Sequence, residues 1–276
     1  MDSNISIYDA VSGILGGEGI NINIEPLNVS RHTRQNSLYL IPGSMNLSNF
    51  EDELGNTFGQ AQAGGSLAIT VQSALYRAIK GIAEKNNFDL VLLDAGPNLG
   101  ALNRVLVGGS DYFIVPVSPD LFSIMGAYNL GERLKTWRSG WETINTAFKT
   151  SQFFRESTNI PSGKPKFLGY IIQKFTTGPT RNPAIAFQNF MNRFEPAFVE
   201  SMIKPLSEYN QIPLGIKDFN MGEIPDMAAA VPTSMEYNCP MHKLYTILGG
   251  VPQAKTGLKM IGHLEESVNR VMEILK

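Results

Sequence analysis

The stretch FDLVLLDAGPNLG, residues 88–100, combines residue types that suit phosphate chemistry. An apolar run ends in a single carboxylate, Asp94, and a turn containing Gly96, Pro97 and Asn98 follows. At the carboxyl end of a buried parallel strand, such a carboxylate points into the crevice where α/β folds bind ligands, and it can hold Mg²⁺ directly or through water. The glycine and proline let the backbone turn close to a γ-phosphate. The alternative is an aspartate that only ends a strand or caps a turn.

The elements around this stretch alternate between strands and helices. Strands are predicted at 38–42, 89–94 and 111–117, and helices at 66–86, about 99–107 and 121–137. The strands 89–94 and 111–117 are nearly continuous apolar runs, which is typical of parallel strands buried on both faces. The helices between them are the crossovers that a parallel sheet requires. We therefore predict an α/β fold, a doubly wound and mostly parallel sheet with helices on both faces.

The second half of the chain continues this alternation. Residues 139–165 are polar and are expected to form an exposed insertion. A strand at 167–172, a helical region at about 183–206 and another strand at about 211–216 follow. A last helix over about 258–275 has one apolar face, formed by Ile261, Leu264, Val268, Val271, Met272 and Leu275. Because glutamates offset the cations of this helix, we expect it to dock on the domain rather than on a membrane.

The segment DLVLLDAGPNLGALNRVLVGGSDYFIVPVSPDLFSIMGAYNLGERL resembles the Walker B and switch II region of the ParA/Soj/MinD-type partition ATPases, which are deviant-Walker P-loop NTPases. The shared pattern is an apolar strand, an aspartate, a proline-containing turn, a helix, a second apolar strand and a further helix. The resemblance is good over residues 38–137 and continues more weakly to about 245. It implies that Asp94 is the Walker B aspartate, with a catalytic and Mg²⁺-binding role. It also implies that Gly96, Pro97 and Asn98 form switch II beside the nucleotide.

Two later segments fit the same resemblance. GYIIQKF, residues 169–175, is similar to the strand that ends beside the adenine in these ATPases, and Gln173 stands where related GTPases place the asparagine that reads the base. IKDFNMGEIPDMAAAVP, residues 216–232, resembles the loop around the base, in which Pro225 would lie against the ring. The alternative for both segments is an ordinary strand end and a surface loop.

The phosphate-binding part of the family pattern is missing from this sequence. Neither a KGGxGKT loop, whose backbone amides and lysine neutralise phosphate charge, nor the switch I run Asp-x-Asp-Pro-Gln precedes residue 94. LGGVPQAKTG, residues 248–257, is similar to such a loop, but it lacks the glycine before Lys255, follows a helix-like stretch and carries Pro252; we interpret it as a chance match. The opening IYDAV is helix-like instead.

We therefore predict one ParA-like domain over residues 1–276 that lacks the first strand, the P-loop and the first helix, through either a misannotated start or a real shortening. Loss of a central strand would expose an apolar sheet edge, so we expect a partner or self-association to cover it.

Composition narrows the classes of function. The 276 residues carry a formal net charge of −2 and a single cysteine, Cys239, so no intramolecular disulfide forms and no global basic field draws the chain to nucleic acid. No run is long and apolar enough to span a bilayer, and we expect a cytoplasmic protein without a signal peptide. The family resemblance implies ATP and Mg²⁺ as cofactors, a homodimer, nonspecific DNA contacts and a ParB-like activator. The cations that could contribute to DNA contacts are Lys164, Lys166, Lys174, Arg181 and Arg193.

Three hypotheses about function follow. The first is a ParA-like ATPase that positions DNA or other cargo and dimerises with ATP and Mg²⁺ when intact. The second is a catalytically inactive ParA-like binding or regulatory module, because the Walker A lysine and switch I are absent. The third is an unrelated α/β enzyme that uses Asp94 as a base, but no histidine or nucleophile stands at a recognisable spacing from it.

Overall fold

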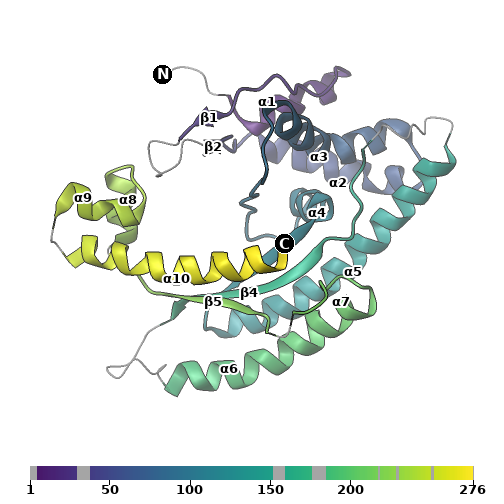
Figure 1. Cartoon of the computed structure of the whole chain (residues 1–276). Coiled ribbons are helices and arrows are strands. Elements are labelled where there is room, and N and C mark those ends of the chain that lie inside the picture. The colour runs from purple at the N-terminus through teal and green to yellow at the C-terminus, as the bar shows by residue number, and fades with distance from the viewer. Residues whose placement is uncertain are drawn as a thin grey trace. The chain divides into compact units, whose positions relative to one another are not determined.

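The computed structural model describes residues 5–29, 38–151, 159–175, 185–216, 218–227, 230–249 and 252–275. The chain divides into two compact units. Their helices and strands are labelled in Figure 1. Unit 1 consists of Met1–Asp111 and Arg133–Pro165, and unit 2 consists of Tyr112–Glu132 and Lys166–Lys276. The long helix α5, Leu121–Thr150, contributes its first part to unit 2 and its second part to unit 1.

Unit 1 is a helical layer with one small antiparallel ladder. Its helices are α1 (Ile7–Val11), α2 (Leu47–Gln62), α3 (Ser66–Asn86), α4 (Ala101–Gly109) and the second part of α5, and a 3₁₀ turn spans Ser12–Gly16. The two-residue strands β1 (Leu27–Asn28) and β2 (Tyr39–Leu40) pair antiparallel.

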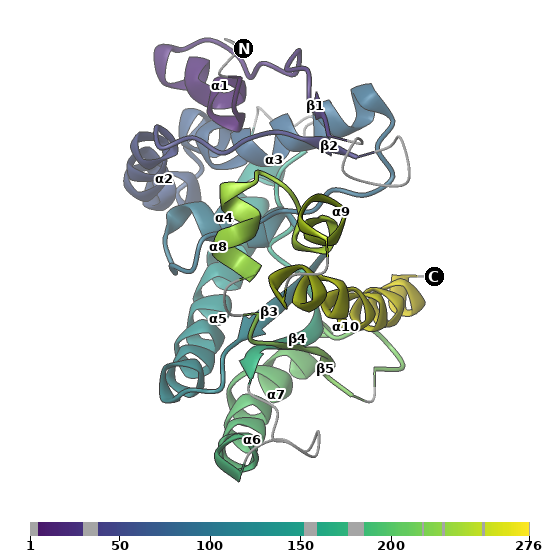
Figure 2. The same cartoon turned by 90° about the vertical axis from the view of Figure 1, so that its left-hand side faces the viewer.

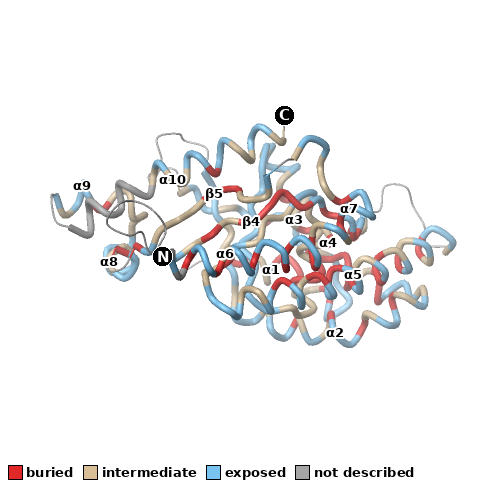
Figure 3. The backbone as a smooth tube through the Cα atoms, turned by 90° about the horizontal axis from the view of Figure 1, so that it is seen from below, coloured by how far each residue is buried: buried red, intermediate tan, exposed pale blue. Residues whose placement is uncertain are grey.

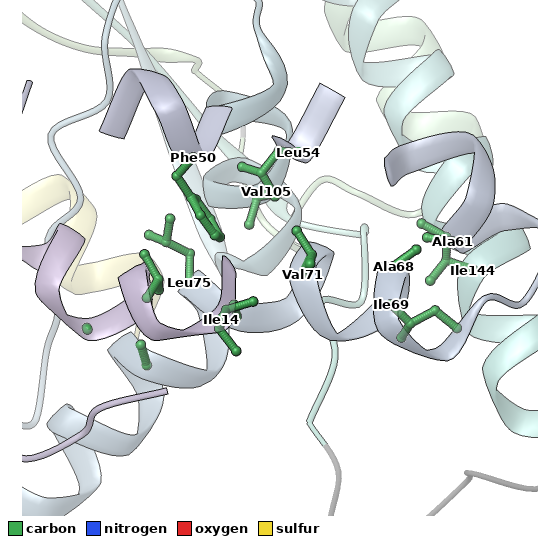
Figure 4. Packing of buried hydrophobic residues seen from close by; sticks show 14 of the residues in the cluster. Ile14, Phe50, Leu54, Ala61, Ala68, Ile69, Val71, Leu75, Val105 and Ile144 are labelled. Atoms are coloured by element: carbon green, nitrogen blue, oxygen red, sulfur yellow. The ribbon is translucent and has the colours of Figure 1, made fainter. Parts of the chain in front are cut away.

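The core of unit 1 lies between these helices (Figure 4). Phe50 and Leu54 of α2, Leu75 of α3 and Val105 of α4 belong to one buried cluster. Ile144 of α5 belongs to the same cluster and lies beside Ala61 at its other end. Helix α3 confirms the predicted 66–86 helix, and its apolar positions at helical spacing face this core. Burial of such an apolar stripe supplies most of the stability of a helix in a protein.

Unit 2 contains a three-stranded parallel sheet in the order β3-β4-β5. Its strands are β3 (Tyr112–Val117), β4 (Lys166–Phe175) and β5 (Asn220–Pro225), and Ile114 of β3 pairs with Gly169 of β4. The helical elements are α6 (Ile185–Phe198), a π-helical turn (Val199–Ile203), α7 (Lys204–Glu208), α8 (Ala230–Glu236), a 3₁₀ turn (Met241–Lys243), α9 (Leu244–Leu248) and α10 (Pro252–Leu275).

Helices cover both faces of this sheet. Helix α10 lies on one face, and α6 and α7 lie on the other (Figures 1 and 2). Gly222 of β5 allows α10 to approach closely: its φ is 155°, and an added Cβ would lie 2.0 Å from Ser267 Oγ of α10. On the other face, Phe167 and Tyr170 of β4 pack against Phe198 in tilted and edge-on arrangements, with ring centroids 5.7 and 5.0 Å apart. Buried positions accordingly follow β4 (Figure 3). The predicted α/β fold with a parallel sheet between helices is confirmed.

Three predicted strands are wrong in position or burial. Residues 38–42 contain only β2, which pairs with the two-residue β1 and is exposed rather than buried. Residues 89–94 are assigned to no strand and join no ladder of the described residues, and Leu92 is 84% exposed. Residues 211–216 are not a strand; the third strand of the sheet is β5, further along the chain. An apolar run favours burial, but it becomes a strand only when a neighbouring backbone pairs with it.

The predicted helices exist with different limits. The 99–107 and 121–137 helices are α4 and α5, and the 183–206 region is α6, the π-helical turn and α7. The exposed insertion predicted at 139–165 is wrong for residues 139–150, because they continue α5 and bury Trp141 and Ile144. Helix α2 was not predicted.

The last helix packs on the sheet, but not by the whole predicted face. Leu264 and Ser267 of α10 face inward, whereas Val268 and Met272 are exposed. Among the described residues, no helix combines the length and apolar composition needed to cross a bilayer.

Candidate functional site

The Asp94 segment lies in unit 1, where it forms an extended stretch followed by the loop Gly96–Gly100. Every residue from Asp89 to Asn98 is exposed, Asp94 included. Within the described part of the chain, no hydrogen bond or ion pair engages the Asp94 carboxylate, and no three His, Cys, Asp or Glu side chains gather as a metal site. Asp94 is therefore a single accessible carboxylate at the start of a turn, which can supply one ligand to a hydrated Mg²⁺.

The loop that follows Asp94 is held by one buried amide. Asn103 of α4 donates from Nδ2 to the carbonyl oxygens of Gly96 and Asn98, at 2.6 and 2.5 Å. Asn98 in turn accepts the Gly100 N–H at its Oδ1, 3.0 Å away. Both donor hydrogens of Asn103 are thus used on the loop backbone, and this fixes three of the candidate residues, Gly96, Pro97 and Asn98, against the start of α4.

A carboxylate from α2 caps the same helix. Glu51 Oε1 accepts the backbone N–H of Leu102, 3.1 Å away, in the first turn of α4. The first amides of a helix have no partner within the helix and carry partial positive charge, so a carboxylate is favoured there. Gly100 makes the approach possible, because a Cβ at this position would lie 2.1 Å from Glu51 Oε1. The Gly96–Gly100 loop and the first turn of α4 therefore contact α2 at Glu51.

The buried Arg104 of α4 makes further contacts with α2. Arg104 donates from Nη2 to the Leu54 carbonyl at 2.7 Å, and its guanidinium lies 3.6 Å from the centroid of the Phe58 ring. Burial lowers the pKa of Arg104 to about 10, and the nearby Glu51 charge partly opposes that shift. Trp141 of α5 donates its indole N–H to the Arg104 carbonyl, 3.2 Å away. The position of α4 is thus fixed by α2 on one side and α5 on the other.

The base-site candidates Gln173 and Pro225 lie in unit 2. Gln173 is in β4 opposite Ile224, and Pro225 is the last residue of β5, opposite Phe175. Because the two strands are parallel, both candidates lie at the same carboxyl edge of the sheet, where α/β folds bind ligands. The structure therefore brings these two residues together. It also corrects the loop predicted around Pro225, because Asn220–Pro225 is a strand.

The candidate residues thus form two groups. Asp94, Gly96, Pro97 and Asn98 belong to unit 1, and Gln173 and Pro225 belong to unit 2. The sequence interpretation missed Glu51, Asn103 and Arg104. An asparagine and an arginine within an apolar helical run are typical of polar side chains that bond inside the fold, so the ALNRVL segment could have drawn attention to the last two. Glu51 has no such signal, because its partner is 51 positions away.

The segment 248–257, which is similar to a P-loop, has a defined backbone on both sides of Gly250 and Val251, and these two residues lie outside the described part of the chain. Gly249 directly follows α9, and α10 begins at Pro252, so Lys255 and Thr256 are helical residues. A P-loop instead joins a buried strand to a helix. The interpretation of this segment as a chance match is consistent with that context.

A family model and several known proteins are similar to this chain. The family model described as "AAA domain" matches residues 4–149, just over half of the chain. The sporulation initiation inhibitor protein Soj of Bacillus subtilis is 27% identical over 120 residues, which cover 44% of this chain and 41% of Soj. An uncharacterised protein of Mycobacterium tuberculosis is 30% identical over 110 residues, or 38% of this chain and 30% of that protein.

A solved structure extends the likeness to most of the fold. The crystal structure of protein DIP2308 from Corynebacterium diphtheriae superposes with a TM-score of 0.63 at 21% identity, over 87% of this chain and 75% of that one. The chain belongs to the AAA domain family, in its ParA/Soj-like branch of P-loop proteins. The chain spans less than half the length of the curated relatives that it matches.

Proposed function

We propose that this chain carries the Walker B and switch II part of a ParA-like ATPase that positions DNA or other cargo. The observation that supports this most directly is the loop after Asp94, which Asn103 and Glu51 fasten to the start of α4. In this proposal Asp94 holds Mg²⁺ through water, and the Gly96–Asn98 backbone follows the γ-phosphate. Gln173 and Pro225 contact the base, and ATP promotes a homodimer that acts on DNA in the cytoplasm.

Each group of candidate residues, taken by itself, suits one part of a nucleotide site. An exposed carboxylate beside a glycine turn suits hydrated Mg²⁺, and two half-buried residues at the end of parallel strands suit a planar base. The metal, when bound, would neutralise phosphate charge. This chain's own contribution is to position the carboxylate and the loop.

A second candidate is a ParA-like binding or regulatory module without catalysis. It is favoured by the sequence, in which no KGGxGKT loop precedes residue 94 and the only similar segment is helical from Pro252 onward. In this case the chain would use its fold to contact a partner, and ATP binding would be weak or lost.

Calorimetry separates the two candidates. The ATPase proposal predicts that the 276-residue chain binds ATP in the presence of Mg²⁺, and that Asp94→Ala weakens this binding at least about tenfold while Asp89→Ala does not. Asp89 is a matched control because it is an exposed aspartate at the other end of the same segment. Absence of Mg²⁺-dependent binding to the wild-type chain would contradict the ATPase proposal and support the regulatory module.

A further inference from the structure

The buried guanidinium of Arg104 in α4 has no anion paired with it. Its Nη2 donates to the Leu54 carbonyl at 2.7 Å and to Gln72 Oε1 at 3.3 Å, and both acceptors are neutral. Within the described part of the chain, its buried Nε has no hydrogen-bond partner and no carboxylate forms an ion pair with it. A buried cation without a paired anion is costly, so a carboxylate nearby should be attracted to it.

The carboxylate of Glu51 is one helical turn away from Arg104. Residues 51 and 54 share a face of α2, and residues 100 and 104 share a face of α4, because positions three and four apart are neighbours on a helix. Arg104 contacts α2 at Leu54, and Glu51 contacts the start of α4 at Gly100 and Leu102. Burial lowers the pKa of Arg104, and the charge of Glu51 partly opposes that shift. The two charged groups are therefore neighbours that are not joined as an ion pair.

We propose that Glu51 is a latch with two positions. In the position seen in the structure, its carboxylate accepts the Leu102 N–H and caps α4. In the second position, the carboxylate leaves Gly100 and accepts the Nε–H of Arg104, which then has its anion. Glu51 is half-buried and can change partner by rotating its own side chain, while α2 and α4 stay packed. Glu51 is thus a positioning residue for the Gly96–Gly100 loop, and Arg104 is its alternative partner.

The loop determines which position Glu51 takes. Gly100 ends the loop, and the Glu51 carboxylate lies where a Cβ on residue 100 would be. A movement of the loop toward α2 displaces the carboxylate by contact, and an anion beside the loop displaces it because like charges repel. The second cause rests on the proposed function, in which a phosphate lies beside this loop. With Glu51 on Arg104, the first turn of α4 is uncapped, so the loop can move without separating α4 from α2.

Gly100→Ala tests the latch in the absence of nucleotide. The added Cβ would lie 2.1 Å from Glu51 Oε1, and the φ of −82° at residue 100 suits alanine, so the variant should fold with the carboxylate displaced. In NMR spectra of the whole chain, the Leu102 amide should exchange at least about tenfold faster, because it loses a hydrogen bond to a charged group. The Arg104 Nε–H should shift downfield and exchange at least about tenfold more slowly, because it gains such a bond.

Two further substitutions separate the latch from a general disturbance of α4. Glu51→Gln keeps an oxygen that can cap Leu102 but removes the charge, so in the Gly100→Ala background most of the slowing at the Arg104 Nε–H should be lost. Asp52→Asn removes a carboxylate from the next, exposed position of α2 and should leave the Arg104 signal unchanged. An Arg104 signal that is the same in the wild type and in Gly100→Ala, or that responds equally to the two α2 substitutions, would overturn the latch.

Addition of ATP separates the latch from the proposed function. If both are correct, ATP with Mg²⁺ shifts the Arg104 Nε–H signal of the wild type in the same direction as Gly100→Ala does. An Arg104 signal that responds to Gly100→Ala in a chain that binds no ATP supports the latch and contradicts the nucleotide proposal. ATP binding by calorimetry, together with an Arg104 signal that Gly100→Ala leaves in place, supports the nucleotide site and refutes the latch.

Discussion

At the scale of single residues, Gly100 and Glu51 connect the end of the candidate loop to α2. The Glu51 carboxylate occupies the space that a Cβ on residue 100 would fill, and it caps the first turn of α4. The side chain of Glu51 is flexible, so a methyl group at residue 100 would displace the carboxylate rather than the backbone. The Glu51 cap of α4 therefore depends on the absence of a side chain at residue 100.

This link predicts a non-additive pair of substitutions. Gly100→Ala should lower the free energy of unfolding by about 1 kcal/mol, because the displaced Glu51 no longer accepts the Leu102 N–H. Glu51→Ala removes the same hydrogen bond, so the double variant should cost little more than either single variant. Urea unfolding of the four proteins measures the coupling.

The control for this cycle is another glycine of the same unit. Gly55 lies inside α2, and a Cβ there would meet no atom within 4 Å. Gly55→Ala should therefore raise the free energy of unfolding by about 0.5 to 1 kcal/mol. Additive losses for Gly100→Ala and Glu51→Ala would show that the carboxylate and the glycine do not compete for one space.

At the scale of elements, helix α1 carries a pH-sensitive cap. Asp9 accepts hydrogen bonds from the backbone N–H and the hydroxyl of Ser6, at 2.7 and 2.8 Å, and these bonds lower the pKa of Asp9 below its ordinary value of 3.8. A lowered folded-state pKa contributes stability that is fully present above the ordinary value and is lost as pH falls through the folded value.

The cap predicts how acid should affect α1. At neutral pH, Asp9→Asn should lower the stability of the helix start, because the carboxylate that accepts both Ser6 hydrogens is gone. At a pH below the lowered folded-state pKa of Asp9 the wild type and the variant should become equally stable, since the wild-type carboxyl is then protonated too. Hydrogen exchange of residues 7–11 at the two pH values measures this. A difference that grows as the pH falls would contradict the assignment.

The segment 89–94 shows why part of the fold could not be predicted from the sequence. The apolar periodicity of α3 predicts its limits and its buried face, because a helix satisfies its own backbone hydrogen bonds. A strand needs a partner that local sequence does not specify, so DLVLLD has the composition of a buried strand and is exposed here. The same distinction applies to the candidate site. Asp94 and its turn can be recognised from the local sequence, whereas Glu51 reaches the loop only through tertiary packing.

Because residues 90–93 are exposed, substitutions there should change the free energy of unfolding little. Leu92→Ser should change the free energy of unfolding by less than about 0.5 kcal/mol, since Leu92 is 84% exposed. Leu75→Ala, in the core of the same unit, should cost about 2 to 5 kcal/mol, because Leu75 is 1% exposed. A large loss of stability in Leu92→Ser would show that this segment is buried as a strand, as its composition predicts.

At the scale of the whole molecule, the two compact units have separate cores. Unit 1 buries the helix contacts around Leu75 and Trp141, and unit 2 buries the aromatic cluster of Phe167, Phe194 and Phe198. The residues of helix α5 are shared between the two units. Units with their own cores can unfold as separate cooperative blocks.

The two tryptophans of the chain make this testable, because Trp137 and Trp141 both belong to unit 1. In urea unfolding, tryptophan fluorescence should report unit 1, whereas circular dichroism at 222 nm reports both units. Leu75→Ala should lower the fluorescence midpoint. Phe194→Ala, which removes a fully buried ring of unit 2, should lower the circular dichroism midpoint and leave the fluorescence midpoint in place. If both substitutions shift both signals together, the 276 residues unfold as one cooperative domain, because loss of either core then destabilises the other.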